Sequence, residues 1–293
     1  EDGTSFNIKN YTHGMFQSVY DYPFLSSSAN HIYDITFAYD EASPLSSSAS
    51  VQNSKKINIY NQFSQLLLGY TGSANTVRRF ESDLEVDGTG EMKEVVIIPF
   101  SRLITKDQIK KGTFSIELGT GSFASPFTTL GGSRLLLQDA SASANGGTTP
   151  TIGGDYGVLY ANNGDGTFGN GHTSGSGVVF YQAGIAVVTA SVFSKAAGNA
   201  LDKTPITDFG AGLPVLNTID AFMTASSISA SCDAFRHRIY NISFNNSTEI
   251  NSTIYFCRLP VNKFNYSSNP TYTQNSKIQV KNESSDLPVS YVT

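Results

Sequence analysis

Alternating hydrophobic and polar positions mark several strands along the chain. Residues 31–39, HIYDITFAY, place aromatic and aliphatic side chains on one face and mixed side chains on the other, and this period of two predicts a strand. The apolar run 95–100 predicts a buried strand, and Pro99 marks its end or a sheet edge. The stretch 178–192 contains Gly184 and predicts either two central strands joined at a bulge or one bent strand. Further strands are expected at 113–118 and 236–244.

Helical spacing is clearest at residues 53–69. Ile57, Tyr60 and Phe63 recur at helical intervals, with Asn53 or Ser54 as the N-cap and Gly69 as the stop. A second, two-turn helix is expected at 105–112, because TKDQ has the form of a capping box and Gly112 follows two lysines. In residues 219–231 the pattern does not separate helix from strand.

The densest strand patterning lies near the C-terminus, in residues 243–280. The β-branched and aromatic run 250–256 is bounded by Asn/Ser-rich turns and stopped by Pro260, which predicts a strand. Residues 277–281 alternate lysine with Ile278 and Val280, and therefore predict a half-exposed strand.

Together these elements predict a mainly β protein. We expect antiparallel, sandwich-like sheets with two or three short helices and long Gly/Ser/Asn-rich loops. Residues 1–30 lack sustained periodicity and are predicted to form an N-terminal arm or loop-rich lead-in. Residues 31–293 are predicted to form one large β-rich domain, with a loop-rich insertion at 131–177.

Composition narrows the class of protein. Of 293 residues, 39% are hydrophobic, enough for a packed core, and only 15% are charged, below the roughly 25% usual in soluble domains. Such a neutral, polar surface favours a protein packed against copies of itself or other subunits, as in virion or extracellular β-proteins. The net charge of −5 argues against nucleic-acid binding, which needs clustered Lys and Arg. No apolar run is long enough to cross a membrane.

No local motif indicates catalysis. The four histidines, His13, His31, His172 and His237, lack metal-ligand spacing, and no nucleophile elbow is present. The loop around 162–165 offers oxygen ligands for calcium but no closing glutamate, so a hairpin tip is favoured. A catalytic carboxylate pair, as in glycoside hydrolysis, is close in space but not in sequence, so it forms no local sequence motif. Asp34, Asp155 and Asp233 are candidates in principle for such a pair. Two buried thiols are favoured over a disulfide between Cys232 and Cys257. We therefore predict no enzyme activity, no catalytic residue, no cofactor and no metal.

Several stretches of the chain resemble a known protein family in their amino-acid sequence. They are FNNSTEINSTIYFCRLPVNKFNYSSNPTY, KKINIYNQFSQLLLGY, LITKDQIKKGTFSIELGTG, DYGVLY and VVFYQAGIAVV. They look like virion structural proteins of large, contractile-tailed bacteriophages of marine cyanobacteria and related bacteria. The resemblance covers about residues 31–293 and rests on no catalytic motif. It implies a non-enzymatic assembly subunit located in the virion, and a family sequence that continues beyond the VSYVT ending.

The expected function is therefore that of a structural subunit of a phage virion, in the tail or baseplate. It would assemble with copies of itself and other virion proteins through sheet edges and Tyr/Asn-rich loops. The predicted assembly contact is the exposed turn containing Lys263, Phe264, Asn265, Tyr266 and Tyr272, because aromatic and amide side chains suit interfaces. The same side chains suit sugars. A carbohydrate-binding adhesin or fibre that recognises a host-surface glycan, and a self-polymerising extracellular filament, therefore remain alternatives.

Overall fold

The structure is a computed structural model that describes residues 6–47, 52–71, 76–119, 134–162, 175–193, 223–224, 227–248, 250–256, 273–274 and 277–278. The chain divides into two compact units, Glu1–Glu249 and Ile250–Thr293. This boundary differs from the predicted one, which separated residues 1–30 from a single domain over 31–293. The described part of 1–30 belongs to the first unit and supplies two strands of its sheet.

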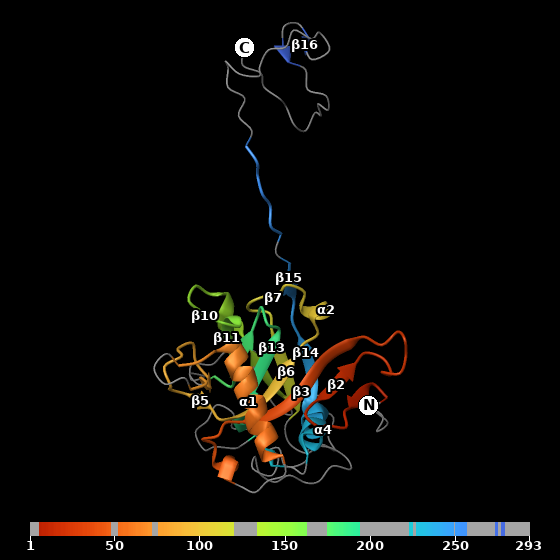
Figure 1. Cartoon of the computed structure of the whole chain (residues 1–293), viewed down its shortest axis with the longest axis vertical. Helices are drawn as coiled ribbons and strands as arrows, with labels where there is room; N and C mark the ends of the chain where they lie inside the picture. The colour runs from red at the N-terminus through yellow and green to blue at the C-terminus, as the bar shows by residue number, and fades with distance from the viewer. Residues whose placement is uncertain are drawn as a thin grey trace. The chain divides into compact units, whose positions relative to one another are not determined.

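The first unit is built on an 11-stranded antiparallel sheet (Figure 1). Its main path runs β1-β2-β3-β6-β13-β12-β11-β9-β8-β14, and β10 pairs with β11. The bounds are β1 Ile8–Asn10, β2 Gln17–Tyr20, β3 His31–Tyr39, β6 Glu94–Pro99, β8 Ser115–Gly119, β9 Arg134–Gln138, β10 Thr149–Thr151, β11 Gly154–Asn162, β12 Gly177–Phe180, β13 Ile185–Thr189 and β14 Ile239–Ser243. The prediction of a mainly β, antiparallel protein is confirmed.

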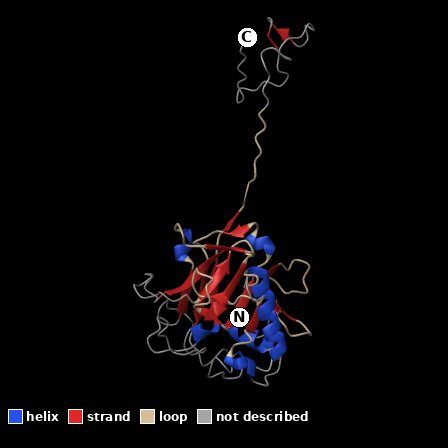
Figure 2. Cartoon of the chain, turned by 60° about the vertical axis from the view of Figure 1, so that its left-hand side comes forward, coloured by secondary structure: helices blue, strands red, loops and turns tan. Residues whose placement is uncertain are grey.

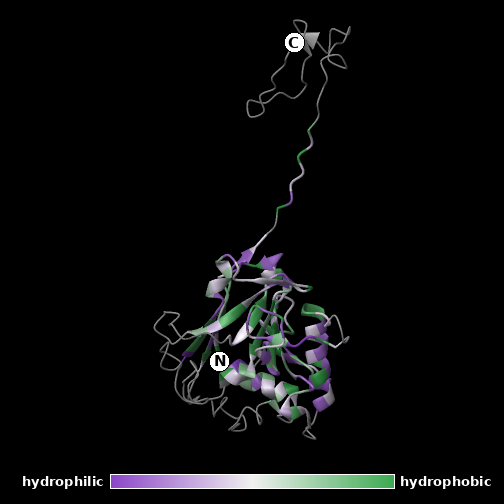
Figure 3. Cartoon of the chain, turned by 90° about the vertical axis from the view of Figure 1, so that its left-hand side faces the viewer, coloured by the Kyte–Doolittle hydropathy of each residue, from purple (hydrophilic) through white to green (hydrophobic). Residues whose placement is uncertain are grey.

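Short elements complete the described chain. Three two-stranded sheets pair β4 Phe80–Glu81 with β5 Glu91–Met92, β7 Gln108–Ile109 with β15 Asn246–Ser247, and β16 Thr273–Gln274 with β17 Lys277–Ile278. The described helices are α1 Asn53–Leu67, α2 Arg102–Thr105 and α4 Ile228–Arg238, with 3-10 turns at Pro44–Ser47, Ala140–Ser143 and Ala190–Phe193. The strands are largely hydrophobic, whereas α1 mixes polar and apolar residues (Figures 2 and 3).

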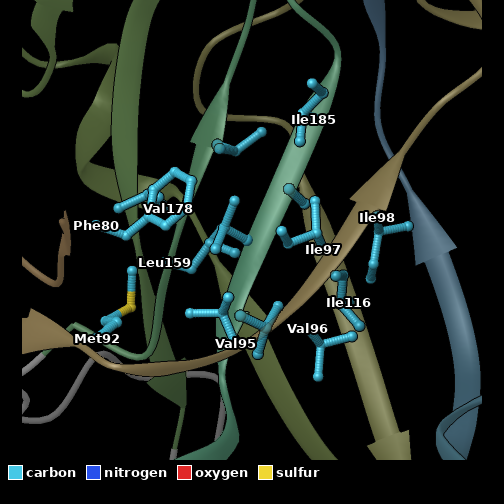
Figure 4. Packing of buried hydrophobic residues seen from close by; sticks show 14 of the residues in the cluster. Phe80, Met92, Val95, Val96, Ile97, Ile98, Ile116, Leu159, Val178 and Ile185 are labelled. Carbon is cyan, nitrogen blue, oxygen red and sulfur yellow. The ribbon is translucent and has the colours of Figure 1, made fainter. Parts of the chain in front are cut away.

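The central strand β6 is buried on both faces, which explains its unbroken apolar sequence. Val95, Val96, Ile97 and Ile98 are all fully buried. Val96 and Ile98 lie on the side of Ile116 of β8, and Val95 lies on the side of Leu159 of β11 (Figure 4).

The sheet also folds over itself. Phe100, just after β6, packs against Phe114 and Phe244 with ring centroids 5.7 and 5.1 Å apart. These two rings flank β8 and β14, at the far end of the strand order. Two halves of one sheet thus enclose the core, which gives the predicted sandwich-like arrangement.

Helices α1 and α4 both pack on β3. The Tyr60 ring of α1 contacts Phe80 at 5.3 Å, and its hydroxyl donates to the Met92 carbonyl at 2.8 Å. On α4, Phe235 meets Phe37 of β3 at 6.1 Å. Helix α1 occupies the predicted segment and stops before Gly69, whose φ of 80° suits a glycine after a helix end.

The predicted helix at 105–112 is wrong. Helix α2 ends at Thr105, Lys106 has a φ of 53°, and residues 108–109 form β7. Thr105 and Ile109 are fully buried, and the Ile109 amide donates to the Tyr181 carbonyl at 3.0 Å. Tertiary burial and this hydrogen bond outweigh the capping-box pattern, which has no apolar stripe to hold a helix on the core.

The predicted strand at 236–244 begins later than its pattern suggested. Residues 236–238 form the last turn of α4, and the strand β14 starts at Ile239. Ser227 caps α4 by accepting from the Ala230 amide at 3.1 Å, and the basic residues of RHR suit a helix C-terminus. The alternation of charged and apolar residues at 236–244 does not distinguish the last turn of a helix from the start of a strand.

The stretch 178–192 forms a hairpin. Strands β12 and β13 pair antiparallel through a turn that ends at Gly184, whose φ is 68°. The described parts of the predicted insertion, 131–177, contribute β9 and β11 to the main sheet. These residues are therefore part of the core architecture.

Candidate assembly surface

The predicted assembly contact lies outside the described residues. This applies to Lys263, Phe264, Asn265, Tyr266 and Tyr272, whose role stays a prediction. The loop at 163–171 and Cys257 also lie outside. The segment that precedes the predicted contact, residues 250–256, is described.

Residues 250–256, drawn in blue in Figure 1, carry four large apolar side chains that are exposed. Ile250, Ile254, Tyr255 and Phe256 are 89%, 73%, 85% and 91% exposed. The sequence predicted a strand here, and this prediction is wrong for the isolated chain, since the segment forms neither a strand nor a helix. A β-prone sequence becomes a strand only when a neighbouring strand supplies its hydrogen bonds.

The two ends of the main sheet differ in how open they are to further pairing. At one end, β1 is three residues long and carries Lys9, and short, charged edges resist added strands. At the other end, β14 is five residues long, uncharged and mostly exposed, with Tyr240 52% exposed. A register shift occurs between Ile239 and Asn241, and Asn241–Ser243 continue in regular register with β8. The edge of β14 is therefore the better acceptor for an additional strand.

A polar cluster surrounds Asp34 of β3. Ser18 donates to Asp34 Oδ1 at 2.5 Å, and His31 Nε2 lies 2.7 Å from the same oxygen. A serine nucleophile would need the histidine as its proton acceptor. Among the described hydrogen bonds none joins Ser18 to His31, so this arrangement orients the Asp34 carboxylate.

The other candidate carboxylates have separate partners. Asp155 pairs with Lys111 at 2.6 Å, and Asp233 accepts from Gln17 Nε2 at 2.7 Å. Since Gln17 and Ser18 are adjacent in β2, their side chains point to opposite faces of the sheet. Asp34 and Asp233 therefore contact opposite faces and cannot flank one substrate bond. Within the described chain, no three His, Cys, Asp or Glu side chains gather as metal ligands.

A buried lysine and a buried thiol lie where α1 and α4 meet. Lys56 is fully buried, and its ammonium donates to the Met223 carbonyl at 2.6 Å. Burial lowers the Lys56 pKa to about 8, and the pKa of the fully buried Cys232 thiol is raised, mainly by burial. The Cys232 thiol donates to the Ile35 carbonyl at 3.2 Å. Both groups are sealed in the core and serve the packing of α1 and α4 on β3.

We expect Lys56→Met to stabilise the protein most at neutral pH. Between about pH 8 and the unfolded-state pKa of about 10.4, the Lys56 position is protonated more often in the unfolded chain than in the folded chain. The free-energy cost of burying this lysine therefore declines as pH rises. The gain in unfolding free energy from Lys56→Met should therefore shrink by about 1 kcal/mol between about pH 7.5 and pH 9. Urea unfolding at both pH values measures it. Lys55→Met, at an exposed neighbouring lysine, is the matched control, and an equal slope in both variants would contradict this interpretation.

Among the described helices, none is long and apolar enough to cross a membrane. Compared with protein-family models, curated proteins and solved structures, the chain matches none.

Proposed function

We propose that this chain is a non-enzymatic structural subunit of a phage virion, in the tail or baseplate. The observation that carries the assembly role is the exposed, β-prone segment 250–256, in which four large apolar side chains are 73–91% exposed. Contiguous apolar exposure of this kind marks interaction sites. The virion context rests on the sequence resemblance and on the low fraction of charged residues, 15%.

Assembly would proceed by strand addition. Residues 250–256 of one copy pair with the uncharged edge of β14 in a second copy, where main-chain hydrogen bonds supply affinity and side-chain pockets supply specificity. Donor segment and acceptor edge belong to the same chain. The contact is therefore head-to-tail, and repetition yields a ring or an open filament according to the rotation between copies.

The test is the size and order of the full-length chain in solution. Light scattering over a concentration series should show a mass that grows with concentration, and negative-stain imaging should show rings or filaments of regular repeat. The chain should also appear in purified particles by mass spectrometry. A stable monomer at all concentrations that never enters a particle would overturn the proposal.

A further inference from the structure

A cavity opens between the N-terminal hairpin, formed by β1 and β2, and helix α1. Its volume is about 270 Å³, near the lower end of small-molecule sites. Met15 and Phe16 line it from the β2 side, and Phe63 lines it from α1. These three side chains are all partly exposed, so apolar surface faces an opening that solvent can reach.

One charged group lines this cavity, the carboxylate of Asp34. Ser18 and His31 both contact its Oδ1, at 2.5 and 2.7 Å, and these contacts fix the carboxylate in place. Thr36 and Gln62 are the other polar side chains in the lining. The Thr36 hydroxyl already donates to the Met15 carbonyl at 2.7 Å. No Lys or Arg occurs among the lining residues described.

We propose that this cavity binds a small organic ammonium compound with an apolar body. The ammonium group would donate to Asp34, and the apolar body would lie against Phe16, Phe63 and Met15. Aromatic faces attract cations, and a desolvated ammonium over such a ring gains about 0.5–2 kcal/mol. A carboxylate fixed by Ser18 and His31, in a lining that also holds two aromatic rings and no Lys or Arg, matches a ligand that carries one positive charge.

A sugar fits the same cavity less well. A hexose buries several hydroxyl groups, whereas the lining offers Asp34, Gln62 and the remaining lone pairs of Thr36 as partners. Each buried hydroxyl left without a partner costs about 1–3 kcal/mol. An ammonium compound needs one strong acceptor and apolar surroundings, which is the composition observed.

The test uses the full chain with phenethylammonium as the probe. Calorimetry and ligand-observed NMR should detect its binding, and 2-phenylethanol, of similar shape but without charge, should bind at least tenfold more weakly. Asp34→Asn should weaken phenethylammonium about 10- to 100-fold, since hydrogen bonds to charged groups contribute about 1.5–3 kcal/mol. The matched control Asp87→Asn removes the same charge at a surface turn outside the cavity and should leave binding unchanged.

A second variant keeps the test decisive if Asp34→Asn fails to fold. Gln62 is exposed on α1 and lines the cavity, so Gln62→Trp should cover the opening and reduce binding at least tenfold while the fold persists. The proposal is overturned if the probe does not bind, if the alcohol binds equally well, or if binding survives both variants. Binding of glucose without binding of phenethylammonium would also overturn it, in favour of a polyol site.

Discussion

A chain that carries aspartate at both Ile254 and Phe256 should lose self-association, with a dissociation constant raised about 10³-fold. Burying an isoleucine or phenylalanine side chain in an interface gains about 1.5–3 kcal/mol each. The variant forfeits both gains and places two charges where the neighbouring strand would pack. Folding of the first unit should be unchanged, because these side chains are 73% and 91% exposed and contribute little to its core.

Leu25→Asp is the matched control for this experiment. Leu25 is 86% exposed, so the change has the same chemistry at a surface not assigned to assembly. Sedimentation velocity of the three proteins at equal concentration measures the effect. If the control disrupts assembly as strongly as the double variant, apolar exposure in general would account for association, and the segment 250–256 would have no special role.

The second large effect concerns stability, and we expect Asp139→Ala to lower the unfolding free energy by about 4 kcal/mol. Asp139 is 1% exposed. Its carboxylate accepts from the Gly112 amide, the Phe114 amide and the Tyr181 hydroxyl, each at 2.9 Å. Alanine leaves all three donors without this acceptor, and the two buried ones, the Phe114 amide and the Tyr181 hydroxyl, cost about 1–3 kcal/mol each.

Tyr181→Phe separates this network effect from simple loss of packing. In the native background it should cost about 1–2 kcal/mol, because it removes one hydroxyl from the carboxylate. In the Asp139→Ala background the hydroxyl already lacks its acceptor, so the same change should cost almost nothing. Chemical denaturation of the four proteins measures the cycle. Additive losses would contradict the role of Asp139 as the shared acceptor.

The contribution of Asp139 to the unfolding free energy also changes with pH. Burial is the largest influence on the Asp139 pKa and raises it above the ordinary value, against hydrogen bonds, including those from Gly112, Phe114 and Tyr181, that lower it. A carboxyl with a raised folded-state pKa holds its proton more firmly in the folded chain. Its contribution to stability is therefore greatest below the unfolded-state pKa and declines as pH rises through the folded-state pKa.

Local pattern predicted the type and place of some elements. Strand β3 covers the expected residues 31–39, and α1 lies in the expected segment, although its N-cap is Gln52 and not the predicted Asn53 or Ser54. In both, the local pattern sets the type of element, but burial departs from it: residues 35–39 of β3 are all buried, and α1 buries Lys56 and Ser64 while Leu66 is 62% exposed. At residues 105–112 the local pattern and the tertiary contacts conflict. There the buried Thr105 and Ile109 decide the structure, and those contacts come from distant parts of the chain.

The candidate assembly surface was predictable only in part. Composition and β-propensity identify residues 250–256 as strand-forming, but whether a strand forms depends on a partner that the sequence of one chain does not specify. The cavity beside Asp34 left no sequence signal. It depends on the register that places Ser18 opposite Asp34 and on the packing of α1 against the hairpin, both of which are long-range.

Hydrogen–deuterium exchange at residues 250–256 tests strand addition most directly. In the dilute monomer these amides should exchange at nearly the rate of an unfolded chain, because the segment forms no strand and its large apolar side chains are exposed. At concentrations where the chain associates, they should become protected together with the outer-edge amides of β14, as strand pairing requires. If the associated protein exchanges these amides as fast as the monomer does, residues 250–256 do not pair, and assembly by strand addition is contradicted.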